Sequence, residues 1–162
     1  MRQRGFTYLA VLFLVALMGL ALTGIATVWH TAAQREKERD LLYVGKQFRL
    51  AIESYYEGSP GALKKYPPNL EELLKDSRFP GIRRHLRRIY RDPVGGGSEW
   101  GLVPAPEGGI MGVHSLSADA PLKRGNFREA ERGLADKGRY ADWQFVYRPA
   151  QPNPAQPKTK LP

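Results

Sequence analysis

A chain of 162 residues is long enough for one small globular domain and too short for two of ordinary size. It contains no cysteine, which excludes disulfide frameworks and thiolate metal sites, so packing alone must hold the domain together. The formal net charge of +9 would suit nucleic acid or an anionic membrane surface, but basic residues are spread from Arg2 to Lys160. The charge alone therefore identifies no partner.

The first long element is an apolar segment that runs from Phe6 to Trp29 without an ionisable side chain. A helix of about 24 residues is about 36 Å long and exceeds the roughly 30 Å hydrocarbon core of a bilayer. We therefore predict a transmembrane helix over 6–29. A cleaved secretory signal is the main alternative, because Met1 to Arg4 supplies a short basic region. Retention in the membrane is favoured, because the apolar run is about twice as long as a signal core and continues without a break into a helical pattern.

Residues 30–57 are predicted to continue this segment as an amphipathic helix. Their apolar positions recur at spacings of three and four, with charged residues between them. These positions are Leu41, Val44, Phe48, Ala51, Ile52 and Tyr55. The charged block 35–40 is interpreted as a solvated face, and Gly45 as either a packing position or a bend. Since Gly58 and Pro60 should end the helix, one continuous helix of roughly 50 residues is expected.

Residues 58–148 are predicted to form a small domain of α+β class. Asn69 and Glu72 have the spacing of an N-capped short helix. A second helical turn is predicted over 82–90, where the apolar residues fall on one helical face. The other faces carry Arg83, Arg84, Arg87 and Arg88. We interpret this basic turn as a solvated face; contact with anionic lipid, nucleic acid or an acidic protein is the alternative.

The second half of this domain is predicted to contain the strands. Apolar alternation around Trp100 to Val103, a turn at Gly108 and Gly109, and the apolar stretch that follows predict a hairpin. A short polar helix is expected over 126–135, with Asn126 and Glu129 as its cap, and a final strand over 140–148. The tail 149–162 is rich in proline and has almost no apolar surface to bury, so it should be disordered. The expected architecture is a long N-terminal helix packed on a small antiparallel sheet.

The junction Arg4, Gly5, Phe6 and Thr7, followed by the long apolar helix, resembles the precursors of type IV pilins and of the pseudopilins of type II secretion systems. Those precursors carry a short basic leader that ends in glycine, and then phenylalanine and threonine. The resemblance implies that residues 1–5 are a leader. It also implies that a prepilin peptidase cuts between Gly5 and Phe6 on the cytoplasmic face, that the new Phe6 amine is N-methylated, and that the fold is pilin-like.

The same resemblance implies that the apolar helix mediates assembly, through Phe6, Leu9, Ala10 and Leu14. Most members of the group carry a glutamate where this chain has Ala10, and that carboxylate is thought to pair with the N-terminal amine of a neighbouring subunit. The first carboxylate after the predicted cleavage point is Glu36. Two alternatives stay open: a subunit at the filament tip, or a filament subunit whose helices pack without this ion pair.

Residues 91–119 resemble the sheet of major pseudopilins, whose sequences pass from an Asp-Pro turn through two strands to a serine-rich loop that bears an aspartate. In those proteins the loop can hold calcium, and the residue in the matching place is Asp119. Calcium needs six to eight oxygen ligands, but Lys123 and Arg124 follow Asp119 instead of further acids. No cofactor is expected, and calcium at Asp119 is only weakly indicated against an ordinary loop.

No glycine-rich phosphate loop, His/Cys cluster or G-x-S-x-G motif occurs, so an enzyme is not expected. The resemblance implies a structural subunit of a type II secretion filament, anchored once in the bacterial inner membrane with a cytoplasmic N-terminus and a periplasmic C-terminal domain. Its partners would be the prepilin peptidase, other pseudopilins and inner-membrane assembly proteins, and not nucleic acid. The alternatives are a DNA-uptake or minor type IV pilin that holds DNA through Arg83 to Arg88, and a signal-anchored envelope protein that enters no filament.

Overall fold

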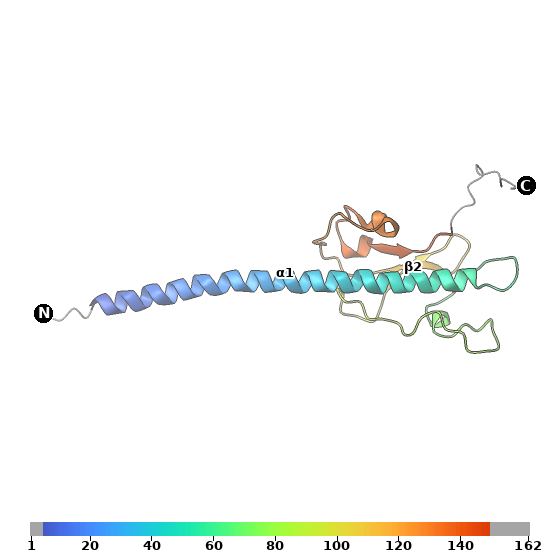
Figure 1. The fold of residues 1–162 in the computed structure, drawn as a ribbon, viewed down its shortest axis with the longest axis horizontal. Helices are drawn as coiled ribbons and strands as arrows, with labels where there is room; N and C mark the ends of the chain where they lie inside the picture. The colour runs from blue at the N-terminus through green and yellow to red at the C-terminus, as the bar shows by residue number, and fades with distance from the viewer. Residues whose placement is uncertain (1–4, 150–162) are drawn as a thin grey trace, which may run out of the picture.

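The protein, seen in a computed structural model, is an α+β molecule in which one long helix carries a small domain on its C-terminal half (Figure 1). The structure describes the backbone of residues 5–149. Outside the described part are residues 1–4 and 150–162 and the side chains of Gly5, Phe6 and 20–28. Most of the predicted leader and of the predicted disordered tail therefore lies outside the described residues.

The long helix, α1, extends over Gly5–Glu57, which is 53 residues. No proline occurs between these bounds, and Pro60 follows soon after them, so the backbone hydrogen-bond ladder has no interruption until the end. Gly58 N closes the last turn on the Ser54 carbonyl at 3.0 Å. The predicted continuous helix and its predicted end at Glu57 are confirmed. Figure 1 shows that the N-terminal half projects away from the domain.

Three short strands form an antiparallel sheet in the order β1-β2-β3. The strands are β1 (Gly101–Pro104), β2 (Ile110–His114) and β3 (Gln144–Val146). The predicted hairpin is β1 with β2, and its turn contains Gly108 and Gly109, both with positive φ of 90° and 84°. Only glycine adopts such angles without strain, which explains the two adjacent glycines. The predicted last strand is confirmed in shorter form, with Trp143 and Phe145 buried and Gln144 exposed between them.

The core lies between the sheet and the apolar face of α1. Every apolar position predicted to face the domain, from Leu41 to Tyr55, is buried. Gly45 lies directly against the Phe145 ring, because a Cβ atom at this position would overlap the ring. The alternatives for Gly45 are thereby resolved: it is a packing position that allows β3 to approach the helix.

Several predicted helices differ in the structure. The helical turn predicted over 82–90 is wrong: this segment is irregular and runs back along α1. The two other predicted helices are present only as short 3-10 turns, Glu71–Leu73 and Glu129–Leu134. Asn126 does not cap the turn Glu129–Leu134: the N-cap position is occupied by Arg128, and Asn126 has a positive φ of 57°. Apolar spacing suggested the helical turn over 82–90, and capping patterns suggested the other two helices, but none of these segments forms an α-helix in the structure.

Candidate functional site

The residues predicted to be processed lie where α1 begins. The helix starts at Gly5, the last residue of the predicted leader, so the predicted scissile bond between Gly5 and Phe6 lies at its first turn. The side chains of both residues lie outside the described part, as do residues 1–4. Cleavage at this bond and N-methylation of Phe6 stay predictions.

The projecting half of α1 exposes apolar side chains on all sides. Every residue from 7 to 19 is exposed, and none of them is Asp, Glu, Lys, Arg or His. The large hydrophobic residues among them are Tyr8, Leu9, Val11, Leu12, Phe13, Leu14, Val15, Leu17 and Met18. Burying one such side chain contributes about 1.5–3 kcal/mol, so this surface has a strong tendency to be covered. Because these positions point in every direction around the helix, a single groove on one partner would not cover them.

The predicted assembly residues lie in this projecting half. Leu9 and Leu14 are 65% and 59% exposed, and Ala10 is exposed between them. Among the residues that the structure describes, no helix is long and apolar enough to cross a membrane. The span predicted over 6–29 includes Phe6 and residues 20–28, whose side chains lie outside the described part, so it stays a prediction.

The domain is attached to α1 at a buried carboxylate. Glu38 is only 4% exposed, although the charged block around it was interpreted as a solvated face, and for Glu38 that prediction is wrong. Its Oε1 atom accepts hydrogen bonds from Leu122 N at 2.6 Å, from Lys123 N at 3.1 Å and from the Tyr140 hydroxyl at 3.0 Å. Burial, opposed by a hydrogen bond from Gln34, raises the pKa of Tyr140 to about 12. The phenol therefore keeps its proton and remains a donor to Glu38.

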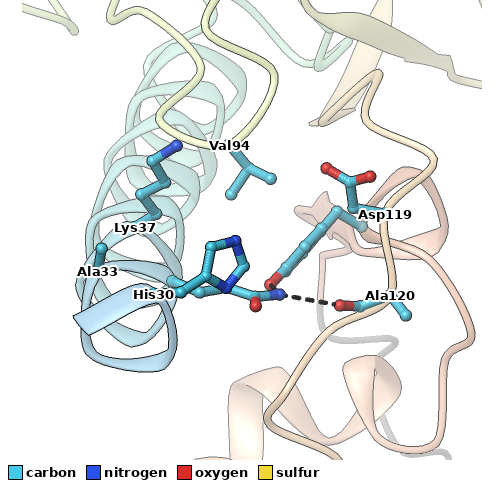
Figure 2. Close-up of a pocket in the computed structure, with 8 residues that line it drawn as sticks. His30, Ala33, Lys37, Val94, Asp119 and Ala120 are labelled. Carbon is cyan, nitrogen blue, oxygen red and sulfur yellow. Dashed lines mark hydrogen bonds between the residues drawn. The ribbon is translucent and has the colours of Figure 1, made fainter. Parts of the chain in front are cut away.

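Beside this attachment is a pocket of about 380 Å³ between α1 and the loop that follows β2. Figure 2 shows His30 and Lys37 on the helix side and Asp119 on the opposite loop. Gln34 forms part of the wall, fixed by hydrogen bonds from its Nε2 atom to the Ala120 carbonyl at 3.2 Å and to the Tyr140 hydroxyl at 3.1 Å. The pocket thus presents one carboxylate opposite two basic groups.

Asp119, the predicted calcium ligand, has few oxygen neighbours. Its carboxylate accepts a hydrogen bond from Ser117 Oγ at 3.1 Å, and the side chains across the pocket include the cationic Lys37. In the described part of the chain no group of three or more His, Cys, Asp or Glu residues could hold a metal ion. The arrangement suits a small polar group of mixed charge better than a bare divalent cation. Calcium at Asp119 stays a prediction.

A second polar network secures the other end of the domain, and no sequence pattern indicated it. Asp76, which is 1% exposed, accepts hydrogen bonds from Arg78 Nε at 2.8 Å and from Arg78 Nη2 at 2.7 Å. These bonds, against the opposing effect of burial, hold the pKa of Asp76 well below its usual range. The Arg78 guanidinium also covers the Tyr55 ring, 3.5 Å from its centroid, and donates to the Tyr55 carbonyl at 2.9 Å. Arg78 therefore satisfies a carbonyl in the last turn of α1.

This network includes Ser54, His85 and Asp76, the residue types of a hydrolase triad, but the two ring nitrogens of His85 face the opposite partners from those in a triad. His85 Nδ1 lies 2.8 Å from Ser54 Oγ, and its Nε2 lies 3.1 Å from Asp76. In a hydrolase the carboxylate orients the histidine and stabilises its protonated form, but here Asp76 is already paired with the Arg78 guanidinium. Ser54 lies inside α1 and not at a sharp turn that would expose a nucleophile. We therefore assign these three residues a structural role: they hold the segment that contains Asp76 and His85 on α1.

Comparison with known protein families, curated proteins and solved structures found no match to this chain. Its function must therefore be argued from its own residues. Among the described residues, two surfaces stand out that the fold itself does not use, the apolar half of α1 and an arginine-rich segment of the domain.

Proposed function

We propose that this chain is a structural subunit of the pseudopilin type, made as a precursor and used in bacterial protein secretion through its assembly into a filament. The observation that supports the proposal most directly is α1 itself, one uninterrupted helix of 53 residues. One half of this helix is built into a domain, and the described part of the other half exposes apolar residues on all its sides.

An apolar surface of this shape needs surroundings that enclose the helix. Hydrocarbon does so for a single subunit, and a bundle of neighbouring helices does so after assembly. A groove on one soluble partner would leave part of the surface in water. A subunit that waits in the membrane and then enters a helical bundle meets the requirement in both states, which is how pseudopilins are expected to work.

The position of the domain supports the same proposal. Its contacts with α1 begin with the hydrogen bonds of Gln34 and continue with the three donors to Glu38. Residues 7–19, which are exposed, are left for other partners. A domain confined to one half allows the projecting halves of several copies to lie side by side while their domains remain outside the bundle.

The proposal places the subunit once across the bacterial inner membrane, with the leader on the cytoplasmic side and the domain in the periplasm. A prepilin peptidase would cut between Gly5 and Phe6, and Phe6 would then be N-methylated. Other pseudopilins and inner-membrane assembly proteins would be its partners. Ala10 leaves the neighbouring amine without a carboxylate, so the proposal includes both a tip subunit and a filament subunit stabilised by packing alone.

The test is the intact mass and N-terminal sequence of the protein taken from membranes of cells with and without prepilin peptidase. We expect a chain that begins at N-methylated Phe6 only where the peptidase is present. Substituting the glycine that precedes the scissile bond, Gly5→Val, should leave the leader uncut, because a side chain there obstructs close approach of the enzyme. A matched substitution inside α1, Gly19→Val, should be processed normally.

The main rival is an envelope protein held by a signal anchor that enters no filament. It would keep Met1 in both strains, and that result would overturn the proposal. Processing without any association of copies would also count against it, because the apolar half would then be explained by anchoring alone.

A further inference from the structure

The second unused surface is an arginine stripe, which we define as the side chains of Arg83, Arg84, Arg87, Arg88 and Arg91. All five are exposed. They alternate in pairs with inward residues: His85 and Leu86 follow the first pair, and Ile89 and Tyr90 follow the second. The two-out, two-in pattern directs every arginine away from the core and every apolar residue toward it.

The backbone of the stripe is anchored at several points. His85 N and Leu86 N both donate to the Leu73 carbonyl, at 2.9 Å and 2.8 Å. Leu86 is 4% exposed, and Trp100 Nε1 donates to the Tyr90 carbonyl at 2.8 Å. The segment is therefore ordered by folding, so a ligand would not have to supply that ordering.

Among the residues that the structure describes, no carboxylate pairs with the stripe. The acids that flank it in sequence, Asp76 and Asp92, are both buried and occupied, the first by Arg78 and the second by Ser115 Oγ at 2.6 Å. Within the described residues, none of the five guanidinium groups forms an ion pair or a hydrogen bond. Two of them stack on rings instead: Arg83 lies 4.6 Å from the centroid of Phe79, and Arg88 lies 5.1 Å from that of Tyr90. The full charge of the stripe faces solvent.

We infer that the arginine stripe binds the phosphate backbone of a nucleic acid. An extended chain from Arg83 to Arg91 would span at most about 28 Å, along which one strand of a duplex presents about eight phosphates. The guanidinium fork matches phosphate geometry, and every basic residue of the stripe is arginine. Each strand of a duplex carries one phosphate about every 3.4 Å, so the regular charge of a nucleic acid complements this row of arginines.

The position of the stripe argues against a lipid surface. The Arg83 guanidinium lies against Gly58, just beyond the C-terminal end of α1. A helix rises about 1.5 Å per residue, so Gly58 is about 42 Å along the axis from His30. A bilayer that held the apolar half would therefore not reach this end of the domain. This argument against lipid rests on the proposed membrane location of the apolar half, whereas the charge and the order of the stripe are properties of the domain alone.

The experiment uses the full-length chain in a non-ionic detergent and a fluorescent 20-base-pair duplex, with anisotropy measured over a range of salt concentrations. The test variant replaces four stripe residues, R84Q/R87Q/R88Q/R91Q, and keeps Arg83 because of its contact with Gly58. The control variant replaces four exposed basic residues elsewhere, R35Q/R124Q/R128Q/K137Q. Both variants lose the same formal charge, so the comparison separates the stripe from the overall charge.

We expect the stripe variant to bind the duplex at least about tenfold more weakly than the unmodified chain, and the control about twofold more weakly. The slope of log K against log salt should become shallower by about 3.6 for four lost phosphate contacts on duplex DNA. Near-UV circular dichroism checks that the variants are folded. The paired variants R84Q/R87Q and R88Q/R91Q serve as a smaller perturbation and should each remove roughly half of that slope change.

Equal weakening in the stripe and control variants would overturn the inference in favour of overall charge. Competition by polyglutamate as effective as competition by DNA at equal charge would overturn it in favour of an acidic protein. Binding to phosphatidylglycerol vesicles that depends on the stripe, without binding to DNA, would assign the surface to lipid. None of these outcomes bears on leader processing, so failure here and failure of the filament proposal are distinguishable.

Discussion

The two halves of α1 have the same backbone and opposite surroundings. Residues 7–19 are exposed on every side, whereas the six apolar positions predicted to face the domain, from Leu41 to Tyr55, are buried against it. The segment 6–29 carries no Asp, Glu, Lys, Arg or His, and the second half carries charges between its apolar positions. Both halves are held as a helix by the same kind of local backbone hydrogen bonds. The halves therefore differ in what their side chains contact, and not in their backbone.

This difference shows where the projecting half of α1 ends and the half that packs on the domain begins. The change does not occur at the first charged residues after the apolar segment, Arg35 and Glu36, which are both exposed. It occurs at the side chains of α1 that form hydrogen bonds with the domain. Gln34 donates to the domain, and Glu38, the more important of the two, accepts from it. The polar attachment, and not the charge pattern, separates the projecting half from the half that belongs to the domain.

A large loss of stability is expected from breaking that attachment. Glu38→Ala would leave two backbone N–H groups and the Tyr140 hydroxyl without their acceptor, and we expect a loss of about 3 kcal/mol in the free energy of unfolding. Chemical denaturation of the full-length chain, followed by near-UV circular dichroism, measures it. Glu38→Gln retains an acceptor oxygen and should lose less.

Glu36→Ala is the matched control, because Glu36 lies two residues away and is paired only with Arg39 at 3.8 Å on the surface. Its loss should change stability by less than about 0.5 kcal/mol. Equal effects of the Glu38 and Glu36 substitutions would contradict the boundary placed at Glu38.

A smaller effect is expected from the same substitution made in each half. Gly45→Ala would drive a Cβ atom into the Phe145 ring and should cost about 2 kcal/mol of domain stability by overpacking. Gly19→Ala meets no atom within 4 Å, so the domain should be as stable as before, and the helix should gain from the better propensity of alanine. Thermal unfolding followed by near-UV circular dichroism measures both. Destabilisation of the domain by Gly19→Ala would mean that the halves are not independent.

The sequence predicted α1 well because its signal is local. Apolar spacing of three and four, and the absence of proline up to Pro60, are properties of neighbouring residues, and they placed the end of the helix at Glu57. The hairpin was predictable for the same reason, since two adjacent glycines mark its turn. The α+β class and the packing of the helix on an antiparallel sheet followed from these two elements.

The buried acids could not be predicted, because their partners are distant in sequence. Glu38 is bound by donors more than 80 residues away, and nothing near it distinguishes it from the exposed Glu36. The helical turn predicted for the segment of the arginine stripe was wrong for another reason. Apolar residues in a two-in, two-out pattern also match helical spacing, but hydrogen bonds to Leu73 hold the chain in an irregular path. Exposure of the arginines was predicted correctly, while the element that carries them was not.

The smallest expected effect on the domain comes from the projecting half, and it separates assembly from folding. Leu14 is 59% exposed, so Leu14→Ala should change the free energy of unfolding of the domain by less than about 0.5 kcal/mol. Phe48→Ala, in the buried half of the same helix, should cost about 3–5 kcal/mol. If the projecting half packs against other copies, Leu14→Ala should still lower the yield of cross-linked oligomers in membranes several-fold. A variant that loosened the domain while leaving cross-linking unchanged would reverse the roles of the two halves, because Leu14 would then belong to the fold and not to the filament.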